Sequence, residues 1–396
     1  MKEGWEYKRM DEVCSIARGG SPRPIKDYIT NDPNGLNWIK IGDTDMGGKY
    51  IYSTKEKIKP EGLKKSRWVE EDEFLLSNSM SFGRPYILKT NGCIHDGWLV
   101  LRDYQKYLNI DFFYYVLSSE NVQRQFRIKA QGSTVSNLNT DRVASVTIPI
   151  PPLSEQQSIV DYLDSAFAKI DAMKANAEKR FNEAQALFQA SLKKMLEPKE
   201  GWEEKTLKET CSVITDGTHH SPVNTANGKY KYVTAKNIKP WGLDLRNITF
   251  VSEDVHKEIV SRCCPQKGDV LYIKDGATTG IAIVNPLDEE FSLLSSVALI
   301  RPNKNIMLSE YLCYALNSPS IYEQTRSQMD GAAITRVTLV KIKGFTIPLP
   351  PLSEQQSIVT TLDSLKSKVD RLQENYDKIY QECDALKQAI LRQVFE

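Results

Sequence analysis

The sequence IPIPPLSEQQSIVDYLD runs from Ile148 to Asp164, and a near-copy, IPLPPLSEQQSIVTTLD, begins 199 residues later at Ile347. These two stretches, here called the proline boxes, differ only at positions 150, 161 and 162 of the first copy. Proline cannot continue a preceding helix, so each box predicts an extended segment that ends where a helix begins. A chain with the same helix entry twice is predicted to be an internal repeat.

The polar residues of the boxes predict where the helices start. Ser154 precedes Gln157 by three residues, and Ser353 precedes Gln356 by three, which is the spacing of a capping box. Beyond the second box, apolar residues recur at steps of four and three, which predicts a coiled-coil seam. The predicted seam consists of Ile358, Leu362, Leu365, Val369, Leu372, Tyr376, Ile379, Cys383, Leu386 and Ile390. The equivalent positions of the first helix are Ile159, Leu163, Ala166, Ile170, Met173, Ala177, Arg180, Ala184, Leu187 and Ser191.

These two seams are predicted to pair with each other. The first seam has smaller side chains than the second, so each is expected to receive the other. Because box and helix recur in the same direction after each globular part, a pseudo-twofold axis would oppose the helices, and we predict an antiparallel coiled coil. An apolar stripe can also pack a helix on its own domain, but the long run without a helix breaker favours the coiled coil.

Further repeats divide the chain. Glu3–Ile16 resembles Glu200–Val213, and Ala186–Glu197 resembles Ala385–Glu396. The interiors between these joints have drifted. The predicted organisation is a globular domain at 1–147, a proline box and helix at 148–197, a second globular domain at 198–346, and a second box and helix at 347–396.

Each globular part mixes strand and helix patterns. NWIKIGD, EFLLSNS, KYVTAKNI, GDVLYIKDG and SVALIRP predict strands. FFYYVLSSENVQRQF and EYLCYALNSPSIYEQT each predict one helix of three to four turns. The fold class is therefore α+β, with a mixed domain that occurs twice.

Composition limits the class of protein. The 396 residues are 40% hydrophobic and 26% charged, which is typical of globular domains, and no apolar run is long enough to span a membrane. The start has no apolar segment of a signal peptide. Seven cysteines, two of them adjacent, favour reduced thiols, so we expect a cytoplasmic protein.

No catalytic motif is recognisable in the sequence. GDTDMGGKY, at 42–50, has a displaced lysine with no Ser/Thr after it and fails as a phosphate loop. The four histidines are badly spaced for a zinc site, and His219 and His220 are expected in a solvated or DNA-facing loop. We therefore expect a binding protein and no enzyme, with no metal and no cofactor held by this chain.

Two clusters of basic and aromatic residues suit contact with a sugar-phosphate backbone. The first contains Lys55, Lys57, Lys59, Lys64, Lys65, Arg67 and Trp68. The second contains Lys229, Tyr230, Lys231, Tyr232, Lys236, Lys239 and Trp241. A solvated lysine-rich face would give the same pattern, and the alternative stays open here.

Polar loop residues are candidates for reading DNA bases, because arginine can pair with guanine and asparagine with adenine. The candidates are Asn78, Ser79, Ser81 and Arg84 in the first half, and Lys274, Asp275, Thr278 and Thr279 in the second. Gln131, Ser133, Thr134 and Arg336 are candidates for phosphate contacts.

Two drifted domains alternating with two near-identical helices, each entered through I-P-[IL]-P-P-L-S-E-Q-Q, resemble the specificity subunit of type I restriction-modification systems over the whole chain. Gly4-Trp5 and Gly201-Trp202, and the turns at 132–135 and 331–334, also look like the family pattern. Within the globular domains such subunits vary widely, so no residue there can be assigned a role from a family motif.

The resemblance implies a non-catalytic subunit in which each globular domain recognises one half of a split double-stranded DNA site and the helices set the spacing. It implies two copies of an adenine-N6 methyltransferase subunit, which would bind S-adenosylmethionine, and translocating endonuclease subunits as partners. The expected docking surface comprises the helices and boxes, with Gln156, Gln157, Gln355, Gln356, Ile358, Leu362, Leu365, Val369 and Leu372. The alternative is a coiled-coil scaffold that joins two protein-binding domains.

Overall fold

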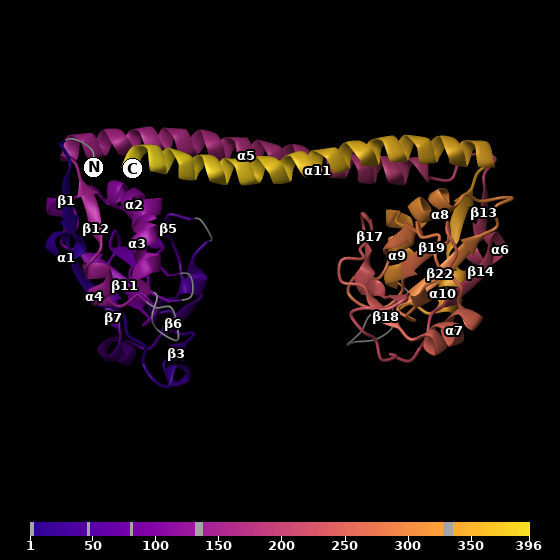
Figure 1. The fold of residues 1–396 in the computed structure, drawn as a ribbon, viewed down its shortest axis with the longest axis horizontal. Coiled ribbons are helices and arrows are strands. Elements are labelled where there is room, and N and C mark those ends of the chain that lie inside the picture. The colour runs from indigo at the N-terminus through magenta and orange to yellow at the C-terminus, as the bar shows by residue number, and fades with distance from the viewer. Residues whose placement is uncertain (1–3, 46–47, 80–81, 131–137, 328–335) are drawn as a thin grey trace. The chain divides into compact units, whose positions relative to one another are not determined.

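The computed structural model describes residues 4–45, 48–79, 82–130, 138–327 and 336–396. The chain forms two compact units: a first unit of Met1–Ala177 with Asp377–Glu396, and a second unit of Glu178–Tyr376. The division passes through both long helices, α5 (Leu153–Met195) and α11 (Leu352–Phe395). Each unit therefore holds one globular part and a portion of each long helix (Figure 1).

The first unit contains two five-stranded sheets and a two-stranded pair. One sheet has the order β2 (Ser15–Arg18), β11 (Trp98–Arg102), β8 (Phe74–Ser77), β9 (Pro85–Leu88) and β5 (Tyr50–Ile51). The other has the order β3 (Ile29–Thr30), β6 (Glu56–Ile58), β4 (Leu36–Ile39), β10 (Gly92–Ile94) and β7 (Arg67–Val69). Strand β1 (Glu6–Arg9) pairs with β12 (Thr147–Ile150). The short helices are α1 (Met10–Val13), α2 (Ile110–Ser118), α3 (Glu120–Ala130) and α4 (Thr140–Ala144), with 3₁₀ turns η1 (Ile25–Asp27), η2 (Ile41–Asp43), η3 (Pro60–Lys65) and η4 (Tyr104–Lys106).

The second unit has a reduced version of the same plan. Its main sheet has the order β14 (Cys211–Asp216), β22 (Val297–Pro302), β19 (Val270–Ile273) and β20 (Ala282–Val284). A second sheet has the order β18 (Thr249–Val251), β15 (Tyr230–Val233) and β21 (Ser292–Leu293). Two pairs join β13 (Glu203–Thr206) to β23 (Thr346–Leu349) and β16 (Ile238–Lys239) to β17 (Gly242–Leu243). The short helices are α6 (Leu207–Thr210), α7 (Glu253–Arg262), α8 (Ser309–Leu316), α9 (Pro319–Ser327) and α10 (Leu339–Lys343), with the 3₁₀ turn η5 (Ala235–Asn237).

Equivalent backbone hydrogen bonds in the two units show which positions correspond, although the sequences have drifted. The amide of Leu138 donates to the carbonyl of Asn78 at 3.0 Å, and the amide of Val337 donates to that of Lys274 at 2.9 Å. Asn78 in turn donates to Gly97, and Lys274 to Ser296. Asn78 and Lys274 thus occupy the same place, directly after β8 and β19, and the predicted duplication of a mixed domain is confirmed.

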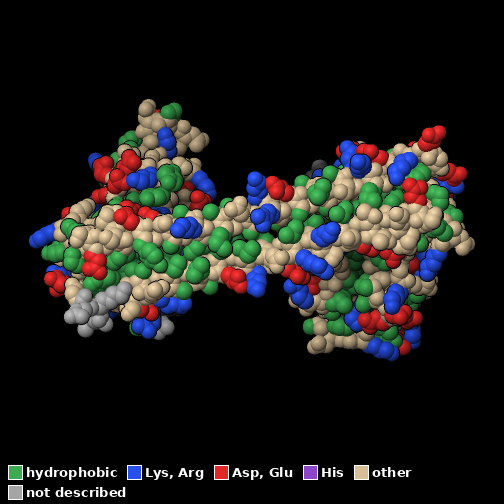
Figure 2. Space-filling model, turned by 90° about the horizontal axis from the view of Figure 1, so that it is seen from above, with side chains coloured by type: hydrophobic (Ala, Val, Ile, Leu, Met, Phe, Trp, Pro, Cys, Tyr) green, Lys and Arg blue, Asp and Glu red, His purple; other side chains and the backbone are tan. Residues whose placement is uncertain are grey.

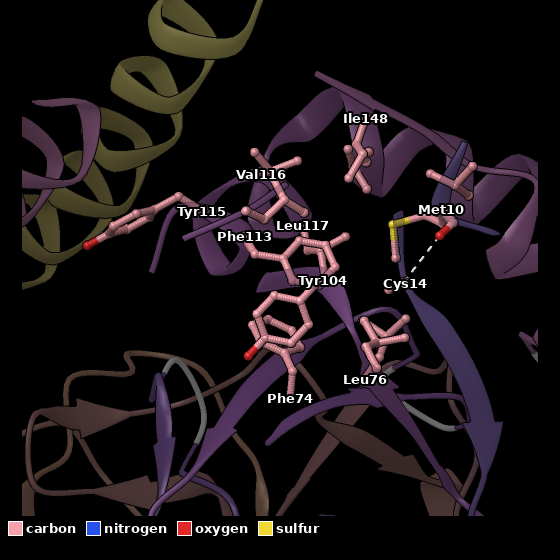
Figure 3. Close-up of a cluster of buried hydrophobic side chains, with 14 of the residues drawn as sticks. Met10, Cys14, Phe74, Leu76, Tyr104, Phe113, Tyr115, Val116, Leu117 and Ile148 are labelled. Carbon is pink, nitrogen blue, oxygen red and sulfur yellow. Dashed lines mark hydrogen bonds between the residues drawn. The ribbon is translucent and has the colours of Figure 1, made fainter. Parts of the chain in front are cut away.

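The core follows from strand alternation, in which successive side chains face opposite sides of the sheet. In β8 all four residues are buried; Phe74 and Leu76 belong to the cluster under α2, and Leu75 belongs to a separate cluster on the other face. Figure 3 shows the first of these clusters, in which the rings of Phe74 and Phe113 lie 4.8 Å apart between centroids. Burial on both faces explains why Phe74, Leu75 and Leu76 form a continuous apolar run.

The predicted single helices after β11 and β22 are each two helices, which corrects the sequence-based expectation. Ser119 is extended, with φ −68° and ψ 148°, and separates α2 from α3. Asn317 caps α8 just before Pro319, which begins α9. Serine and proline at these places interrupt a pattern whose apolar spacing alone looks continuous.

A buried glutamine fixes the start of each long helix to its own globular part. Gln156 donates to the carbonyls of Tyr107 and Pro151, both at 2.8 Å, and accepts from the amide of Asn109 at 2.8 Å. Gln355 makes the same three bonds, to Ile306, Pro350 and Leu308, at 2.7–2.9 Å. Both side chains are fully buried, so the box glutamines act as clamps between helix and domain.

Further pairs repeat around this clamp. The indole of Trp5 donates to Glu155 at 2.8 Å and that of Trp202 to Glu354 at 2.9 Å. Tyr314 donates to Asp363 at 2.6 Å, and Tyr115 bonds Asp164 in the same way. These contacts join the N-terminal part of each long helix to the residue just before β1 or β13 and to α2 or α8.

Each long helix begins one residue before its box serine, at Leu153 in the first copy and Leu352 in the second. The carbonyl of Pro351 accepts from the amides of Glu354 and Gln355, so this proline residue supplies the first helical carbonyl of α11. The prediction that Ser154 and Ser353 are N-caps is therefore wrong, and both lie in the first turn.

The long helices pair antiparallel, as predicted (Figure 1). In the first unit Asp171 pairs with Lys387 at 2.6 Å and Lys174 pairs with Asp384, so rising numbers on α5 meet falling numbers on α11. In the second unit the rings of Phe181 and Tyr376 stack, with centroids 5.8 Å apart.

The predicted seam of α5 is wrong at every second position after Ile170. Met173 and Leu187 are 55% and 62% exposed, and Arg180 is exposed as well. Lys174, Phe181 and Phe188 lie at the interface instead, because the pattern steps by four residues after Ile170 where the second helix suggested three. The other predicted positions, Ala177, Ala184 and Ser191, are partly buried as expected, so small side chains alternate with large ones on this part of α5. On α11 the seam holds to Cys383, but Leu386 is 46% exposed and Lys387 takes the inner position.

This correction predicts different outcomes for adjacent residues. Phe188→Glu places a charge beside the buried Ile358 and Leu362 cluster and is expected to destabilise the second unit by about 3 kcal/mol. Leu187→Glu, next to it on the exposed face, is expected to cost less than about 0.5 kcal/mol. Urea unfolding followed by circular dichroism measures both; equal midpoints for the two variants would contradict the revised seam.

The clamp makes a second prediction. Gln355→Leu keeps the volume but leaves the Leu308 amide and two carbonyls without their partner, at about 1–3 kcal/mol for each buried group left unpaired. We expect faster hydrogen exchange at the Leu308 amide and a lower urea midpoint. The exposed neighbour is the control: Gln356→Leu should leave both unchanged.

Candidate nucleic-acid interface

Lysines of the first basic cluster hydrogen-bond to loops beside the sheet of β3, β6, β4, β10 and β7. Lys57 and Lys59 donate to the carbonyls of Pro33 and Asp27, both at 2.7 Å, and Lys65 donates to the hydroxyl of Tyr28 at 2.8 Å. A neutral acceptor orients an ammonium group without cancelling its charge. The surface at η1 and η3 therefore stays positive, which suits attraction of phosphates.

The remaining cations of this region differ in their partners. Arg67 donates to the carbonyl of Arg18 at 2.7 Å. Lys64 and Arg84 are exposed, and neither has an ion pair among the described residues. These two side chains are the least constrained of the predicted contacts in the first unit.

The second basic cluster is weaker than its sequence suggests. Lys231 is paired with Glu289 at 2.7 Å, which neutralises it locally. Lys229 is exposed and lies over the ring of Tyr230 at 4.9 Å, and Trp241 is 66% exposed. The Lys229 end of this cluster therefore presents a cation without an ion pair among the described residues, beside an aromatic ring.

The predicted base-reading residues divide into buried and exposed groups. Asn78 is 1% exposed, and its amide donates to the carbonyl of Asp96 at 2.9 Å. Lys274 is 2% exposed, and Thr279 is 6% exposed with its hydroxyl bonded to Gly276 at 2.7 Å. These three side chains support the loops from within. Ser79 is partly exposed and Thr278 exposed, so they remain placed for contact. Ser81, Gln131, Ser133 and Thr134 lie outside the described residues.

Lys274 is the centre of a chain of alternating charges in the second unit. Its ammonium lies 3.4 Å from Asp216 Oδ2 and 3.3 Å from Asp275 Oδ2. Asp216, which is 3% exposed, also pairs through Oδ1 with Arg262 at 2.8 Å. Asp275 pairs through Oδ1 with Arg336 at 3.1 Å. The two arginines end the chain at the surface, with side chains 54% and 50% exposed.

His219 joins the same network. Its Nε2 lies 3.3 Å from Asp216 and 3.0 Å from the Arg262 guanidinium. Its side chain is 45% exposed, so the expected position of His219 in a polar surface loop agrees with the structure. Gly217, between Asp216 and this loop, cannot be replaced by a larger residue, because a Cβ there would lie 1.8 Å from the carbonyl of Leu293.

The first unit has a different set of polar contacts at the corresponding place, next to Asn78. Asp96 accepts from Ser21 at 2.7 Å and pairs with the exposed Arg23 at 3.3 Å. The hydroxyl bond from Ser21 lowers the pKa of Asp96, so this carboxyl stays ionised at neutral pH. Arg18 donates to the carbonyl of Asp96 at 2.9 Å. Burial lowers the pKa of the adjacent His95, whose two ring nitrogens face the amides of Ile41 and Gly97.

Sequence reasoning missed Asp216, Arg262, Arg18, Arg23 and Asp96. Arg18 and Asp216 share one signal, since each is the last residue of a strand and precedes a glycine. The other three stand in helices and loops whose sequence gives no indication that they approach this edge.

The residues predicted for partner docking also divide. Gln156 and Gln355 are buried clamps, and Ile358 and Leu362 are buried in the core of the second unit. Leu365, Val369 and Leu372 are partly buried on the paired helix. Gln157 and Gln356 are exposed, and Gln157 accepts from Asn109 at 3.0 Å.

The described residues contain no group of three or more His, Cys, Asp or Glu side chains that could hold a metal ion. None of the helices within the described part of the chain is long and apolar enough to cross a membrane.

Comparison with known proteins identifies relatives over the whole chain. The family described as type I restriction modification DNA specificity domain matches twice, at residues 2–179 and 199–381. The specificity subunit of the type I restriction enzyme EcoBI from Escherichia coli is 23% identical over 99% of this chain and 86% of its own length.

Solved structures share the fold. A chain from a structure of a type I R-M system, described for its complex assembly and conformational transition, has a TM-score of 0.77 at 21% identity, covering 100% of this chain and 98% of that one. The HsdS subunit from Thermoanaerobacter tengcongensis has a TM-score of 0.58 at 21% identity, covering 100% and 97%. The two-domain architecture with paired long helices is thus shared with these proteins.

Proposed function

The chain belongs to the family of type I restriction-modification DNA specificity subunits, and from this premise we propose that its two units each read one half of a two-part, asymmetric DNA site. Recognition of a DNA target is the function of the family. The observation that carries the two-part reading is the repeat itself: two copies of one fold have different buried residues, Asn78 and Lys274, at the same place. The exposed cations beside them differ as well, with Arg23 in the first unit and Arg262 and Arg336 in the second.

We further propose that the subunit acts without catalysis of its own, in the cytoplasm, as part of a complex with methyltransferase and endonuclease subunits. The methyltransferase subunits would bind S-adenosylmethionine and methylate adenine at N6. The antiparallel helices would set the spacing of the two half-sites. Family membership sets aside the alternative of a coiled-coil scaffold for two protein-binding domains.

The proline boxes support two equivalent docking sites for methyltransferase subunits. The identity of Gln156 and Gln355 is explained within the chain by the clamp. The identity of Leu153 and Leu352 is not, because these side chains are 53% and 36% exposed. An exposed leucine kept in both copies favours an outside partner that binds twice.

The paired helices add apolar surface. Figure 2 shows hydrophobic side chains gathered along the helices on one face of the molecule. In the first unit the exposed apolar residues of α5 and α11 include Tyr162, Met173 and Leu386, at 52%, 55% and 46%. Apolar side chains on an exposed helix face favour a protein partner rather than DNA.

The docking proposal predicts the effect of a charge at each box. Leu153→Glu and Leu352→Glu are each expected to remove one of two bound methyltransferase subunits, because each buries a charge in one apolar contact. Light scattering of the mixed subunits measures the stoichiometry. Val223→Glu, at a residue 89% exposed in a loop, is the control. Two methyltransferase subunits bound to the double variant would contradict this docking site.

Modular reading predicts the effect of a domain exchange. Replacing residues 1–147 with the corresponding domain of a related subunit should change one half of the methylated sequence and keep the other half and the spacing. Sequencing of methylated adenines in a host with the complete complex measures this. A change in both halves, or in neither, would contradict separate reading.

A further inference from the structure

A buried lysine needs a physical reason in a protein core. Taking a charge out of water is unfavourable by several kcal/mol unless partners compensate it, and Lys274, at 2% exposure, has the carboxylates of Asp216 and Asp275. These carboxylates in turn bind Arg262 and Arg336. The ammonium group therefore lies between two carboxylates, each of which also faces a guanidinium group.

The fold does not require this charge. Asn78 occupies the same place in the first unit, with the same backbone bonds before and after it, and carries no charge. The place of Asp216 at the end of β14 corresponds to that of Arg18 at the end of β2, since Asp216 pairs with Ala298 and Arg18 with Leu99 in equivalent registers. One domain therefore has Arg and Asn where the other has Asp and Lys.

The two arginines at the exposed ends of the network can donate hydrogen bonds in defined directions. Arg262 uses one terminal nitrogen, Nη2, in its contacts with Asp216 and His219. Arg336 forms an ion pair with Asp275 through Nε at 3.1 Å without hydrogen-bond geometry, since Asp275 Oδ1 has no hydrogen-bond partner among the described residues. About half of each arginine side chain faces solvent. A planar guanidinium held by a carboxylate has further N–H groups in a fixed plane, which match paired acceptors such as guanine O6 and N7. Attraction to phosphate needs charge without this orientation, and the lysine-rich surfaces provide that.

We propose that Lys274 is a positioning residue for the second half-site, which holds Arg262 and Arg336 through Asp216 and Asp275 so that both guanidinium groups donate to acceptor pairs on DNA base edges. The inference rests on the proposed reading of DNA by each unit. It assigns contact with the second half-site to Arg262 of α7 and Arg336 of the segment before α10, held by residues at the end of β14 and directly after β19. Lys274 itself touches no DNA and acts through its carboxylate partners.

The test uses the complete chain assembled with its methyltransferase subunits. Methylation is measured on a library of DNA sites in which one half is varied at a time around the sequence that the wild-type complex methylates. Lys274→Met keeps the length of the side chain and removes its charge. We expect the preference for the correct second half-site to fall at least about tenfold, with the first half-site read as before.

Surface variants keep the test decisive if Lys274→Met fails to fold. Arg262→Lys and Arg336→Lys retain the charge at half-exposed positions but lose the planar fork, and each should also reduce second-half preference about tenfold. Lys267→Met, at a residue 60% exposed and paired with Asp288, is the matched control and should read both halves as the wild type does.

Three outcomes overturn the assignment. Folded Lys274, Arg262 and Arg336 variants that still discriminate the second half-site as the wild type does would remove it. The assignment would also fail if Arg262→Ala and Arg336→Ala weakened binding of the complex to all DNA sequences equally. In that case the slope of log K, the DNA-binding constant, against log salt concentration would fall by about one per variant, which would place both arginines on phosphates. If the wild-type complex methylates no specific sequence, the proposed function fails as well, which distinguishes that case from the first two.

Discussion

The structure depends on a neutral amide buried where each long helix leaves its globular domain. Gln156 and Gln355 each satisfy two carbonyls and one amide of the chain around them, and a side chain without both donor and acceptor cannot do so. An unpaired buried group costs about 1–3 kcal/mol, so this place tolerates almost no replacement. The clamp joins the start of each long helix to its own globular part and so helps to fix the direction in which that helix leaves it.

This constraint explains why the repeat is uneven along the sequence. Residues that join helix to domain recur in both copies, as in Tyr115–Asp164 and Tyr314–Asp363 at an offset of 199, because both copies face the same geometrical requirement. The recognition edge faces no such requirement. There the backbone is held by main-chain bonds after β8 and β19, which any residue can make, so the side chains are free to differ.

The fold could be predicted from sequence because its signals are local and repeated. The boxes, the strand patterns and the heptad spacing each lie within one segment, and the fold class and the antiparallel pairing are confirmed. Predictions failed where tertiary packing chooses between neighbours. Leu187 and Phe188 are both apolar and adjacent, and only the partner surface decides that Phe188 is inside. Ser119 ends α2 within an apolar pattern that looks continuous.

The candidate site was less accessible to sequence reasoning, and Lys274 shows why. A lysine followed by aspartate in a glycine-containing loop indicates a solvent-exposed contact, yet its burial depends on Asp216, which stands on a different strand. Arg262 and Arg336 reach the same network from segments far apart in the chain. Charged residues are recognisable one at a time, whereas their compensation is a property of the folded sheet.

Buried ion pairs give little net stability, since replacing them with apolar groups is often neutral or favourable. The equivalent loop of the first unit has no buried cation: Asn78 stands there, and its Oδ1 has no hydrogen-bond partner among the described residues. A charge retained in the second unit at this cost is therefore better explained by what it orients than by what it stabilises. The same scaffold then offers two solutions, a guanidinium edge in one unit and an Asp96-centred edge in the other, which is what a reader of two unlike half-sites requires.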